Sequence, residues 1–320
     1  MSVLVTGGTG CLGYHILSMA VKSKGKLYSY SLDSPHPYRS LTHVEYIKGD
    51  LQDEKKLIDI LESTRPDEIY HTAAQNSVGL SQLRPVETLL TNILGTQILF
   101  EAIRKTVPKA RVILISGSEV YGSGKGIAER LHTESDPLLP LTPYATSKAS
   151  CELLARQYHH AHGLETITLR PFHFTGPFQS NRYVIPDIAK QICTIERYSG
   201  ELTLYTGNLD ISRDYTDVRD IARAILLLSQ AGTPGETYNI CSGTAHTIRE
   251  LVEFLIRVSG LPLEIRHDPS RARAVDIPML IGSPEKINRL TGWKPLISLE
   301  DSLTDVYTQW KTLFDFTNLP

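Results

Sequence analysis

The sequence has few cysteines and lacks any long hydrophobic run. Its 4 cysteines fall in neither a CxxC nor a Cys/His ligand spacing, so we expect no disulfide framework and no metal site. No window approaches the roughly 18 apolar residues that a membrane span requires. The N-terminal stretch MSVLVTGGTG contains neither a basic segment nor a long apolar run, so no signal peptide is predicted. These absences favour a cytoplasmic protein without a membrane partner.

The sequence also lacks a large excess of either charge. It carries 33 Lys and Arg against 35 Asp and Glu, which gives a formal net charge of −2 at pH 7. Proteins held to nucleic acid by bulk charge are strongly basic, so no nucleic-acid partner is expected. The chain does have 320 residues, 41% of them hydrophobic, which is enough for one large core or two coupled ones.

Short apolar runs alternate with helical patterns over the first part of the chain. We expect strands at 3–7, 26–32, 43–47, 67–73, 111–116 and 165–170, and helices near 11–23, 53–63, 85–106 and 142–162. Apolar strands that alternate with helices build parallel βαβ units. Residues 1–171 are therefore predicted to form an α/β domain with a doubly wound parallel sheet of the Rossmann type.

The pattern changes after residue 171. Segments become shorter, and Pro and Gly interrupt them more often. Residues 172–320 are predicted to form a smaller C-terminal α/β lobe that binds substrate. Two of its segments, near 216–230 and 236–241, are expected to return to the main sheet, so the two parts interleave.

A glycine motif follows the first predicted strand. In Gly7-Gly8-Thr9-Gly10-Cys11-Leu12-Gly13, the glycines at 7, 10 and 13 fit a GxxGxxG spacing. The first permits a tight turn, the second lets backbone approach a pyrophosphate, and the third allows close packing of helix on strand. The helix that begins here, at Cys11 and Leu12, presents its N–H groups to the phosphates. We therefore predict a site for NAD(P)(H).

Two other strand ends are predicted to contact the dinucleotide. Asp50, which together with Leu51 follows the third strand, could accept a hydrogen bond from the adenine amino group, or it could cap the next helix. Ala73 and Ala74 follow the fourth strand, where small residues let the backbone pass close to the cofactor.

The end of the second strand bears on cofactor choice. An acidic side chain there accepts bonds from the ribose hydroxyls and repels a 2′-phosphate, which selects NAD over NADP. Asp33 could take this role, but Ser31 occupies the more usual position and Arg39 lies downstream. The sequence leaves the choice between NAD and NADP open.

Tyr144 and Lys148, in the sequence YATSK, lie four residues apart and share one face of a predicted helix. A free phenol has a pKa of about 10, and to exchange a proton near neutral pH that value must fall by a few units. The Lys148 ammonium is expected to lower the pKa of Tyr144 by stabilising the phenolate. The same lysine can hold the nicotinamide ribose. This pair is predicted to serve hydride transfer.

The sequence SGSEVYG leaves the fifth predicted strand. A hydroxyl of Ser116 or Ser118 in this loop would donate to a substrate carbonyl and stabilise the developing alkoxide. Glu119 is either a general acid/base or a loop carboxylate.

These motifs together resemble the extended short-chain dehydrogenase/reductase family of nucleotide-sugar epimerases, dehydratases and reductases. The resemblance covers essentially the whole chain: the glycine motif, HTAA, TNILGT, SGSEVYG, YATSK, RPFHFTGP and SRDYTDVRDIA. It implies that Asn92 and Pro171 join the cofactor site. It also implies a homodimer in which the helices near 85–106 and 142–162 pack against their copies.

The second half is similar to the GDP-mannose 4,6-dehydratases and to the GDP-4-keto-6-deoxymannose reductases. Gly176-Pro177 with Gln179-Ser180, IAKQI and the stretch TGNLDISRDYTDVRDIARA carry this similarity. The chain looks closer to the reductases, because its connection at 33–43 is brief where the dehydratases usually carry a longer, Arg-rich segment.

The chain departs from the family pattern at two positions. Gly117 stands where the dehydratase Thr or the reductase Ser is usual, so Ser118 or Ser116 must supply the hydroxyl, and dehydration is disfavoured although Glu119 is present. His173 stands where Asn is usual. It either retunes substrate orientation or is a packing change.

The resemblance also implies a substrate site. A nucleotide sugar carries two anionic phosphates, and Arg or Lys must point at them. Arg213 and Arg273 are the candidates for the diphosphate and ribose, Lys190 could join them, and Asp276 is a plausible partner for a guanine edge. Gln179 completes the predicted set.

The predicted reaction is reduction of the 4-keto group of a GDP-bound 4-keto-6-deoxyhexose. The alternatives are a GDP-mannose 4,6-dehydratase or a nucleotide-sugar 4-epimerase, both with tightly bound NAD. A non-enzymatic alternative is an NAD(P)-binding regulator or scaffold.

Overall fold

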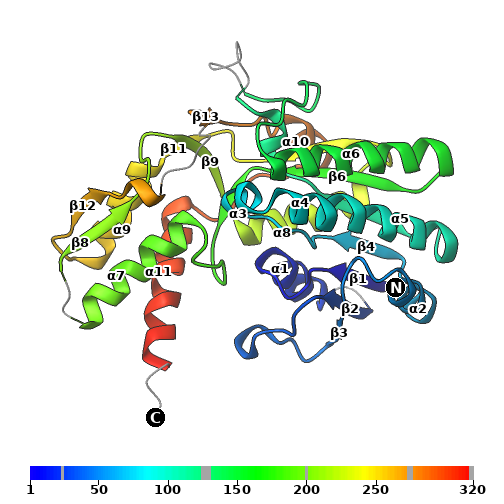
Figure 1. Ribbon diagram of the computed structural model, residues 1–320, viewed down its shortest axis with the longest axis horizontal. Helices are drawn as coiled ribbons and strands as arrows, with labels where there is room; N and C mark the ends of the chain where they lie inside the picture. Colours follow the sequence, from blue (N-terminus) through cyan, green and yellow to red (C-terminus); the bar gives the residue numbers. More distant parts are fainter. Residues whose placement is uncertain (23–24, 124–130, 199–200, 272–276, 317–320) are drawn as a thin grey trace.

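The centre of the molecule is a seven-stranded parallel sheet. The computed structural model describes residues 1–22, 25–123, 131–198, 201–271 and 277–316 (Figure 1). The strand order is β10-β6-β5-β4-β1-β2-β3. The strands are β1 Ser2–Thr6, β2 Lys26–Ser31, β3 Val44–Lys48, β4 Glu68–His71, β5 Arg111–Ile115, β6 Thr166–Pro171 and β10 Thr237–Ile240. The prediction of a doubly wound parallel sheet is confirmed.

The strand order reverses between β1 and β4. From β1 the chain moves outward through β2 to β3, then returns to the other side of β1 and continues through β4, β5 and β6. In open α/β sheets, ligands bind outside the carboxyl ends of the strands at such a switch point. The glycine motif follows β1 at this point.

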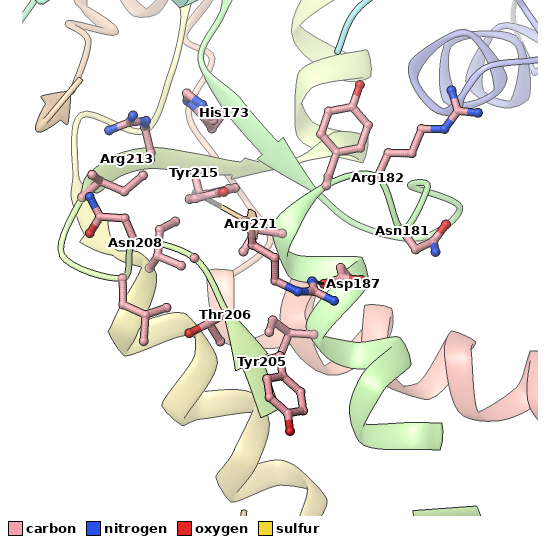
Figure 2. Close-up of a pocket in the computed structure, with 17 residues that line it drawn as sticks. His173, Asn181, Arg182, Asp187, Tyr205, Thr206, Asn208, Arg213, Tyr215 and Arg271 are labelled. Atoms are coloured by element: carbon pink, nitrogen blue, oxygen red, sulfur yellow. Dashed lines mark hydrogen bonds and ion pairs between the residues drawn. The ribbon is translucent and has the colours of Figure 1, made fainter. Parts of the chain in front are cut away.

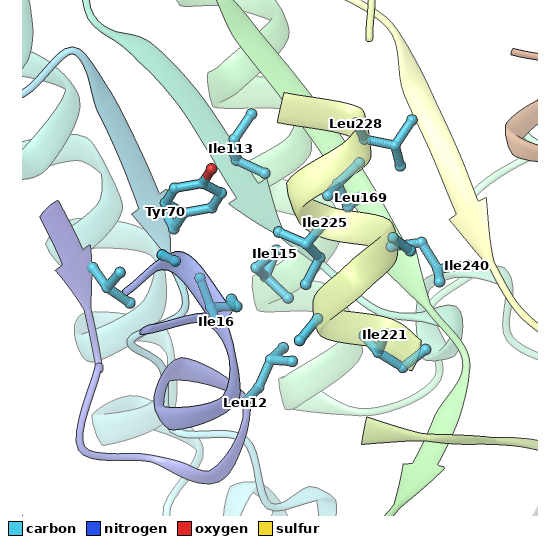
Figure 3. Packing of buried hydrophobic residues seen from close by; sticks show 14 of the residues in the cluster. Leu12, Ile16, Tyr70, Ile113, Ile115, Leu169, Ile221, Ile225, Leu228 and Ile240 are labelled. Carbon is cyan, nitrogen blue, oxygen red and sulfur yellow. The ribbon is translucent and has the colours of Figure 1, made fainter. Parts of the chain in front are cut away.

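Helices cover both faces of the sheet. On one face lie α1 (Cys11–Ala20) and α8 (Val218–Ala231). Figure 3 shows Ile16 of α1 and Ile225 of α8 packing towards the same strands. On the other face lie α2 (Glu54–Thr64), α5 (Gly95–Thr106) and α6 (Pro143–His162). Each helix buries one apolar side, and burial of this kind is the main stabilising contribution to such a sheet.

The segments expected to return to the sheet both lie against it. Residues 216–230 form the end of β9 (Ser212–Asp217) and nearly all of α8, which covers the sheet. Residues 237–240 form β10, which pairs in parallel with β6 at the edge. The second half of the chain therefore completes the first half's sheet.

The helical region predicted at 85–106 contains a wider turn. It consists of α4 (Pro85–Leu89), a π-helical turn labelled η2 (Leu90–Leu94) and α5, and it is preceded by α3 (Val78–Leu83). Single π-turns inside α-helices often occur at functional sites. Asn92, one of the predicted cofactor residues, lies in this turn and is 2% exposed.

The remaining elements form a smaller lobe, on the left in Figure 1. Strands β7 (His173–Thr175), β11 (Ala245–Thr247) and β13 (Met279–Leu280) pair with β9, while β8 (Thr203–Thr206) pairs with β12 (Glu264–His267). The lobe's helices are α7 (Val184–Tyr198), α9 (Ile248–Ser259) and α11 (Leu299–Phe316), and they share an apolar core. The short helix α10 (Glu285–Thr291) packs instead beside α8 and β10.

The structure also bears on the membrane spans, disulfides and metal sites that the sequence led us not to expect. Among the helices of the described residues, none has the length and apolar character needed to cross a membrane. The four cysteines are free, and within the described residues no three His, Cys, Asp or Glu side chains gather closely enough to hold a metal ion.

His71 ties the end of β4 to its neighbours and gives the fold a pH dependence. Its Nδ1 lies 2.7 Å from the Thr6 hydroxyl and its Nε2 lies 2.9 Å from the Thr96 hydroxyl. Burial, together with the nearby Lys148 cation, lowers the pKa of His71 from 6.5 to about 3. The unfolded chain therefore binds more protons between these two values, and stability falls as the pH falls through that window.

We expect the melting temperature to drop by several degrees between about pH 7 and pH 5. Measuring it by calorimetry across this range, in the wild type and in His71→Gln, isolates the contribution of the imidazole. The variant should show a flatter pH dependence, and an equally steep dependence in both proteins would contradict the assignment to His71.

Candidate functional site

The glycine turn after β1 is built by close backbone contacts. Gly7 has a φ of +74°, and its N–H donates to the Tyr30 carbonyl at 2.8 Å. A Cβ on Gly7 would lie 2.7 Å from the Ala73 nitrogen, and a Cβ on Gly13 would lie 2.4 Å from the Gly7 carbonyl oxygen. Both distances are too short for any side chain, so the turn depends on glycine at these positions.

The same turn brings the start of α1 to the sheet's edge. Gly10 is the N-cap residue of α1 and has no side chain to offer the first-turn N–H groups. The Cys11 thiol donates to the Pro177 carbonyl at 3.5 Å, and burial raises its pKa to about 12. Cys11 and the buried Leu12 are thus available to an anion through their backbone rather than their side chains.

The predicted adenosine-side residues lie at neighbouring strand ends. Ser31 is buried, and its hydroxyl accepts a hydrogen bond from the Thr9 N–H at 3.3 Å. A small cavity beside it is lined by residues that include Thr9, Asp33 and Lys48. An acidic and a basic group therefore both face this cavity.

The other predicted cofactor residues occupy adjoining positions. Asp50 is exposed and accepts a hydrogen bond from the Gln52 N–H at 3.0 Å, while Leu51 is buried. Ala73 and Ala74 are half-buried at the end of β4, where the Ala73 N–H donates to the Thr6 hydroxyl at 3.4 Å.

Asn92 connects this edge to the start of α6. Its amide oxygen accepts from the Gln75 N–H at 2.8 Å, and its amide nitrogen donates to the Gln75 carbonyl at 3.0 Å and to the Ser147 hydroxyl at 2.8 Å. Ser147 in turn donates to the Tyr144 carbonyl at 2.7 Å. Asn92 thereby fixes the helix turn that carries Tyr144 and Lys148.

Lys148 of α6 is buried, and its ammonium lies at the end of β5. Its ammonium donates to the Ile115 carbonyl at 2.7 Å, and burial lowers its pKa. A buried cation fixed to a backbone carbonyl has a defined position, which suits a group that must hold a ligand hydroxyl.

The pKa of Tyr144 moves in the direction opposite to that expected from the sequence. Burial raises it most, and the nearby Tyr183, Glu119 and Cys151 raise it further. Lys148, expected to lower the pKa of this phenol, bonds to the Ile115 carbonyl instead. Burial therefore disfavours the phenolate form of Tyr144 in this structure.

Position 117 faces the Tyr144 hydroxyl. A Cβ on Gly117 would stand 3.5 Å from the Tyr144 hydroxyl oxygen and 3.9 Å from the carbonyl oxygen of Pro171, which is buried. A hydroxyl-bearing residue at 117 would therefore lie beside the phenol, but this chain has glycine there.

The two serines predicted to replace that hydroxyl differ in their surroundings. Ser116 donates to the Glu152 carboxylate at 2.5 Å, within a buried pair in which Arg170 also donates to Glu152 at 2.6 Å. Ser118 is 3% exposed in a short 3₁₀ turn after β5. The Ser116 hydroxyl is thus directed at Glu152 rather than at the Tyr144 phenol.

Glu119 and His173 form a pair beside Tyr144. The His173 Nε2 lies 3.5 Å from a Glu119 carboxylate oxygen, and the two side chains are 22% and 12% exposed. His173 is the first residue of β7, and its ring lies 5.6 Å from the ring of Tyr215 in β9. Glu119 is therefore close to both the phenol and the imidazole.

A cavity of about 300 Å³ opens next to His173, in the smaller lobe. Figure 2 shows the side chains of Arg213, Tyr215 and Arg271 lining this cavity together with that of His173. Arg213 is 2% exposed, and its Nη1 donates to the Ile277 carbonyl at 2.6 Å. A buried guanidinium in the wall of a cavity favours an anionic ligand.

Other predicted substrate residues lie elsewhere. Lys190 lies on α7, with its ammonium 5.7 Å from the centre of the Trp310 ring of α11, away from the described cavity lining. Gln179 is buried and donates to the Phe174 carbonyl at 2.9 Å. Arg273 and Asp276 fall outside the described residues.

Sequence reasoning missed several residues of the cavity. Arg182 and Arg271 both line it, and Arg271 forms an ion pair with Asp187 of α7. Tyr183 lines it as well and is one of the groups that raise the pKa of Tyr144. The only sequence signal was local: Arg182 and Tyr183 follow the GPFQS motif closely.

The chain is similar to known proteins over nearly its whole length. The family model described as GDP-mannose 4,6 dehydratase matches residues 4–306. The chain is 33% identical over 310 residues to the GDP-6-deoxy-D-mannose reductase of Pseudomonas aeruginosa, covering 97% of each protein. It is 31% identical over 324 residues to a dTDP-glucose 4,6-dehydratase of Streptomyces niveus, covering 97% of this chain and 92% of that one.

A solved structure is also similar over its full length. The structure of RMD from Pseudomonas aeruginosa complexed with NADPH matches with a TM-score of 0.84 and 31% sequence identity, covering 98% of this chain and 100% of the other.

Proposed function

The chain belongs to the GDP-mannose 4,6-dehydratase family, and from that premise we propose that it is an NAD(P)H-dependent reductase of a GDP-bound 4-keto-6-deoxyhexose. The observation that carries this proposal is the position of the Tyr144 phenol beyond the carboxyl end of β5, where a Cβ at position 117 would stand 3.5 Å from its oxygen. Its relatives include a GDP-6-deoxy-D-mannose reductase and a structure complexed with NADPH, which supports the same reading.

The residues at the switch point fit a nicotinamide dinucleotide. The turn at Gly7 and Gly13 is packed so closely against backbone that neither position admits a Cβ, and the start of α1 beyond Gly10 directs backbone N–H groups to the same edge. Lys148 is close enough to this edge to hold the nicotinamide ribose, and Asn92 keeps its helix in position. When bound, the reduced nicotinamide supplies hydride to the C4 carbonyl carbon.

Tyr144 is proposed to donate a proton to the carbonyl oxygen of the substrate. A reductase requires a phenol that is protonated at the start of the reaction, whereas a dehydratase or epimerase begins by oxidising the sugar and requires the phenolate as base. Burial raises the pKa of Tyr144 and favours the protonated form. The similarity to a GDP-6-deoxy-D-mannose reductase, rather than this direction, supports reduction over the two alternatives.

The cavity of the smaller lobe suits the nucleotide part of the substrate. Arg213 is buried in its wall, and Arg182 and Arg271 also line it. Arginine binds phosphate oxygens in bidentate fashion, so these side chains are candidates for the two phosphates. The ion pair with Asp187 holds the Arg271 guanidinium at the cavity, and a bound phosphate would compete with Asp187 for this guanidinium.

A 4,6-dehydratase is the nearest rival, because Glu119 is present. Elimination needs a carboxylate at this position, but the Glu119 carboxylate lies 3.5 Å from the His173 Nε2, and the chain is 33% identical to a GDP-6-deoxy-D-mannose reductase against 28% to a GDP-mannose 4,6-dehydratase. We therefore favour the reductase.

Isotope transfer distinguishes the two. The enzyme would be given GDP-4-keto-6-deoxymannose and NADPH carrying deuterium at the reactive nicotinamide carbon, and the product would be examined by mass spectrometry and NMR. A reductase transfers the label to C4 of the sugar. A product without label, or conversion of GDP-mannose by a protein carrying its own NAD, would refute the proposal.

We also propose a homodimer through the helices near 85–106 and 142–162. Apolar side chains on these helices and just before them are 42–81% exposed: Leu83, Val86, Leu90, Leu94 and Leu153. The first four follow a helical spacing of three and four residues and form one stripe, and α4 packs against α6, which carries Leu153. An exposed apolar patch of this kind marks a protein interface.

The double variant Leu90→Glu/Leu94→Glu is expected to be monomeric, because the dimer would have to bury four charges. Light scattering coupled to size exclusion measures the mass directly. Leu296→Glu is the matched control, since Leu296 is 67% exposed but lies outside the stripe. A wild-type monomer, or a dimer that survives both substitutions, would contradict the proposed interface.

A further inference from the structure

We propose that His173, positioned by Glu119, replaces the hydroxyl missing at position 117 and donates a hydrogen bond to the carbonyl oxygen that Tyr144 protonates. The inference rests on the proposed reductase function. It assigns to the Glu119–His173 pair a role in polarising the carbonyl, and it explains how the chain tolerates glycine at 117.

The strand register brings these positions together. Ile115, the last residue of β5, pairs with Leu169 of β6, and Gly117 and Pro171 lie two residues beyond this pair. The Gly117 contact agrees, because a Cβ there would be 3.9 Å from the Pro171 carbonyl oxygen. His173 follows two residues later, at the start of β7. The loop that carries Gly117 and the strand that begins at His173 are thus adjacent.

The geometry around Tyr144 leaves a place for a second polar group. A Cβ at 117 would be 3.5 Å from the phenol oxygen, so a serine hydroxyl there would stand next to the reacting carbonyl. Ser116 is directed at Glu152 instead, at 2.5 Å. A carbonyl that is being reduced develops negative charge on its oxygen, and a donor in addition to the phenol stabilises it.

His173 reaches the same region from the cavity side. It lines the cavity of the smaller lobe, and its Nε2 lies 3.5 Å from the Glu119 carboxylate. Glu119 is also near enough to Tyr144 to act on the phenol. The carboxylate attracts the Nε2–H group of His173, which is the proposed donor, since Nδ1 is buried.

The proposed step adds no redox partner to the reaction. The hydride from the reduced nicotinamide forms the C4–H bond, the carbonyl π-electron pair moves to the oxygen, and the Tyr144 proton forms the O–H bond. His173 only donates a hydrogen bond and keeps its proton throughout. Glu119 touches neither substrate nor cofactor in this scheme and is a positioning residue.

A double-substitution experiment tests this role. His173→Asn introduces the residue usual in the family, and its amide is too short to reproduce the Nε2 contact with Glu119. Loss of one oxyanion donor typically costs about a hundredfold in kcat, and we expect a loss of that size with the KM for NADPH unchanged. Gly117→Ser alone should change kcat little. Combined with His173→Asn, it should restore kcat to within about tenfold of the wild type.

The assay is the steady-state oxidation of NADPH with GDP-4-keto-6-deoxymannose. His246→Asn is the matched control, because His246 also pairs with a glutamate, Glu250, at 3.7 Å, but is not among the residues that line the cavity. Glu119→Gln should lower kcat and should also be rescued by Gly117→Ser. Rescue by a hydroxyl on another loop is not expected from a merely structural loss.

The outcomes separate this inference from the proposed function. An active wild type with an unchanged His173→Asn variant would overturn the inference alone, as would a double variant no faster than His173→Asn. Equal loss of kcat in Ser118→Ala without loss in His173→Asn would assign the donor to Ser118 instead. A wild type that oxidises no NADPH would overturn the proposed function and this inference with it.

Discussion

Replacing Tyr144 with Phe is expected to lower kcat by at least about a thousandfold while leaving the dissociation constant for NADPH nearly unchanged. The variant removes one oxygen atom and retains the ring. The phenol is the group assigned to protonate the substrate oxygen, and burial keeps it protonated at neutral pH. The glycine turn and Lys148, which are assigned to the cofactor, are untouched by the substitution.

Stopped-flow or steady-state rates, together with fluorescence titration of NADPH, measure the two quantities separately. Tyr198→Phe is the control, because Tyr198 is 63% exposed at the end of α7 and should be replaceable at no cost. A Tyr144→Phe variant with more than about a tenth of the wild-type kcat would remove the phenol from the mechanism.

Replacing Gly13 with Val is expected to weaken NADPH binding by at least about a hundredfold, or about 2.7 kcal/mol. A Cβ at this position would lie 2.4 Å from the Gly7 carbonyl oxygen and 2.7 Å from the Gly8 Cα. Both contacts are with backbone, so relief requires α1 to move away from the turn. That movement separates the helix N-terminus from the phosphates it is proposed to bind.

Calorimetric titration with NADPH measures the loss, and the melting temperature without ligand reports whether the variant is folded. Gly79→Ala is the control, since a Cβ there meets nothing within 4 Å. If the Gly13 variant proves too unstable to assay, the smaller Gly10→Ala, whose Cβ would lie 3.2 Å from the Gly7 oxygen, provides a graded test. Unaltered affinity in a folded Gly13→Val protein would contradict the proposed cofactor site.

The sheet and its glycine turn were predictable because their signals are local. Each strand of the first half is a short apolar run, and the spacing of Gly7, Gly10 and Gly13 follows from backbone contacts within one turn. Tyr144 and Lys148 were predictable for the same reason, since four residues on a helix define a shared face.

What the sequence could not provide was the direction of individual side chains. The Ser116 hydroxyl is directed at Glu152 of α6 because Arg170 of β6 holds that carboxylate, and these three residues meet only in the folded sheet. Lys190 extends over Trp310 of α11 because of how α7 packs on that helix. Neither contact can be predicted from the spacing of residues within one segment of the sequence.

The cavity and the pKa of Tyr144 also depend on tertiary packing. Arg182 and Arg271 are far apart in the sequence and approach one another only where α7 meets the segment after β12. From the sequence, Lys148 was expected to have the largest effect on the pKa of Tyr144. In the structure, burial has the largest effect. Desolvation is set by the surrounding elements rather than by neighbours four residues away.

The central claim is net reduction of a 4-keto sugar nucleotide, and the absorbance of NADPH tests it most directly. On mixing the purified protein with GDP-4-keto-6-deoxymannose, the account predicts loss of absorbance stoichiometric with formation of a GDP-6-deoxyhexose. Constant absorbance, from a protein that carries bound NAD and converts GDP-mannose without added cofactor, would contradict it.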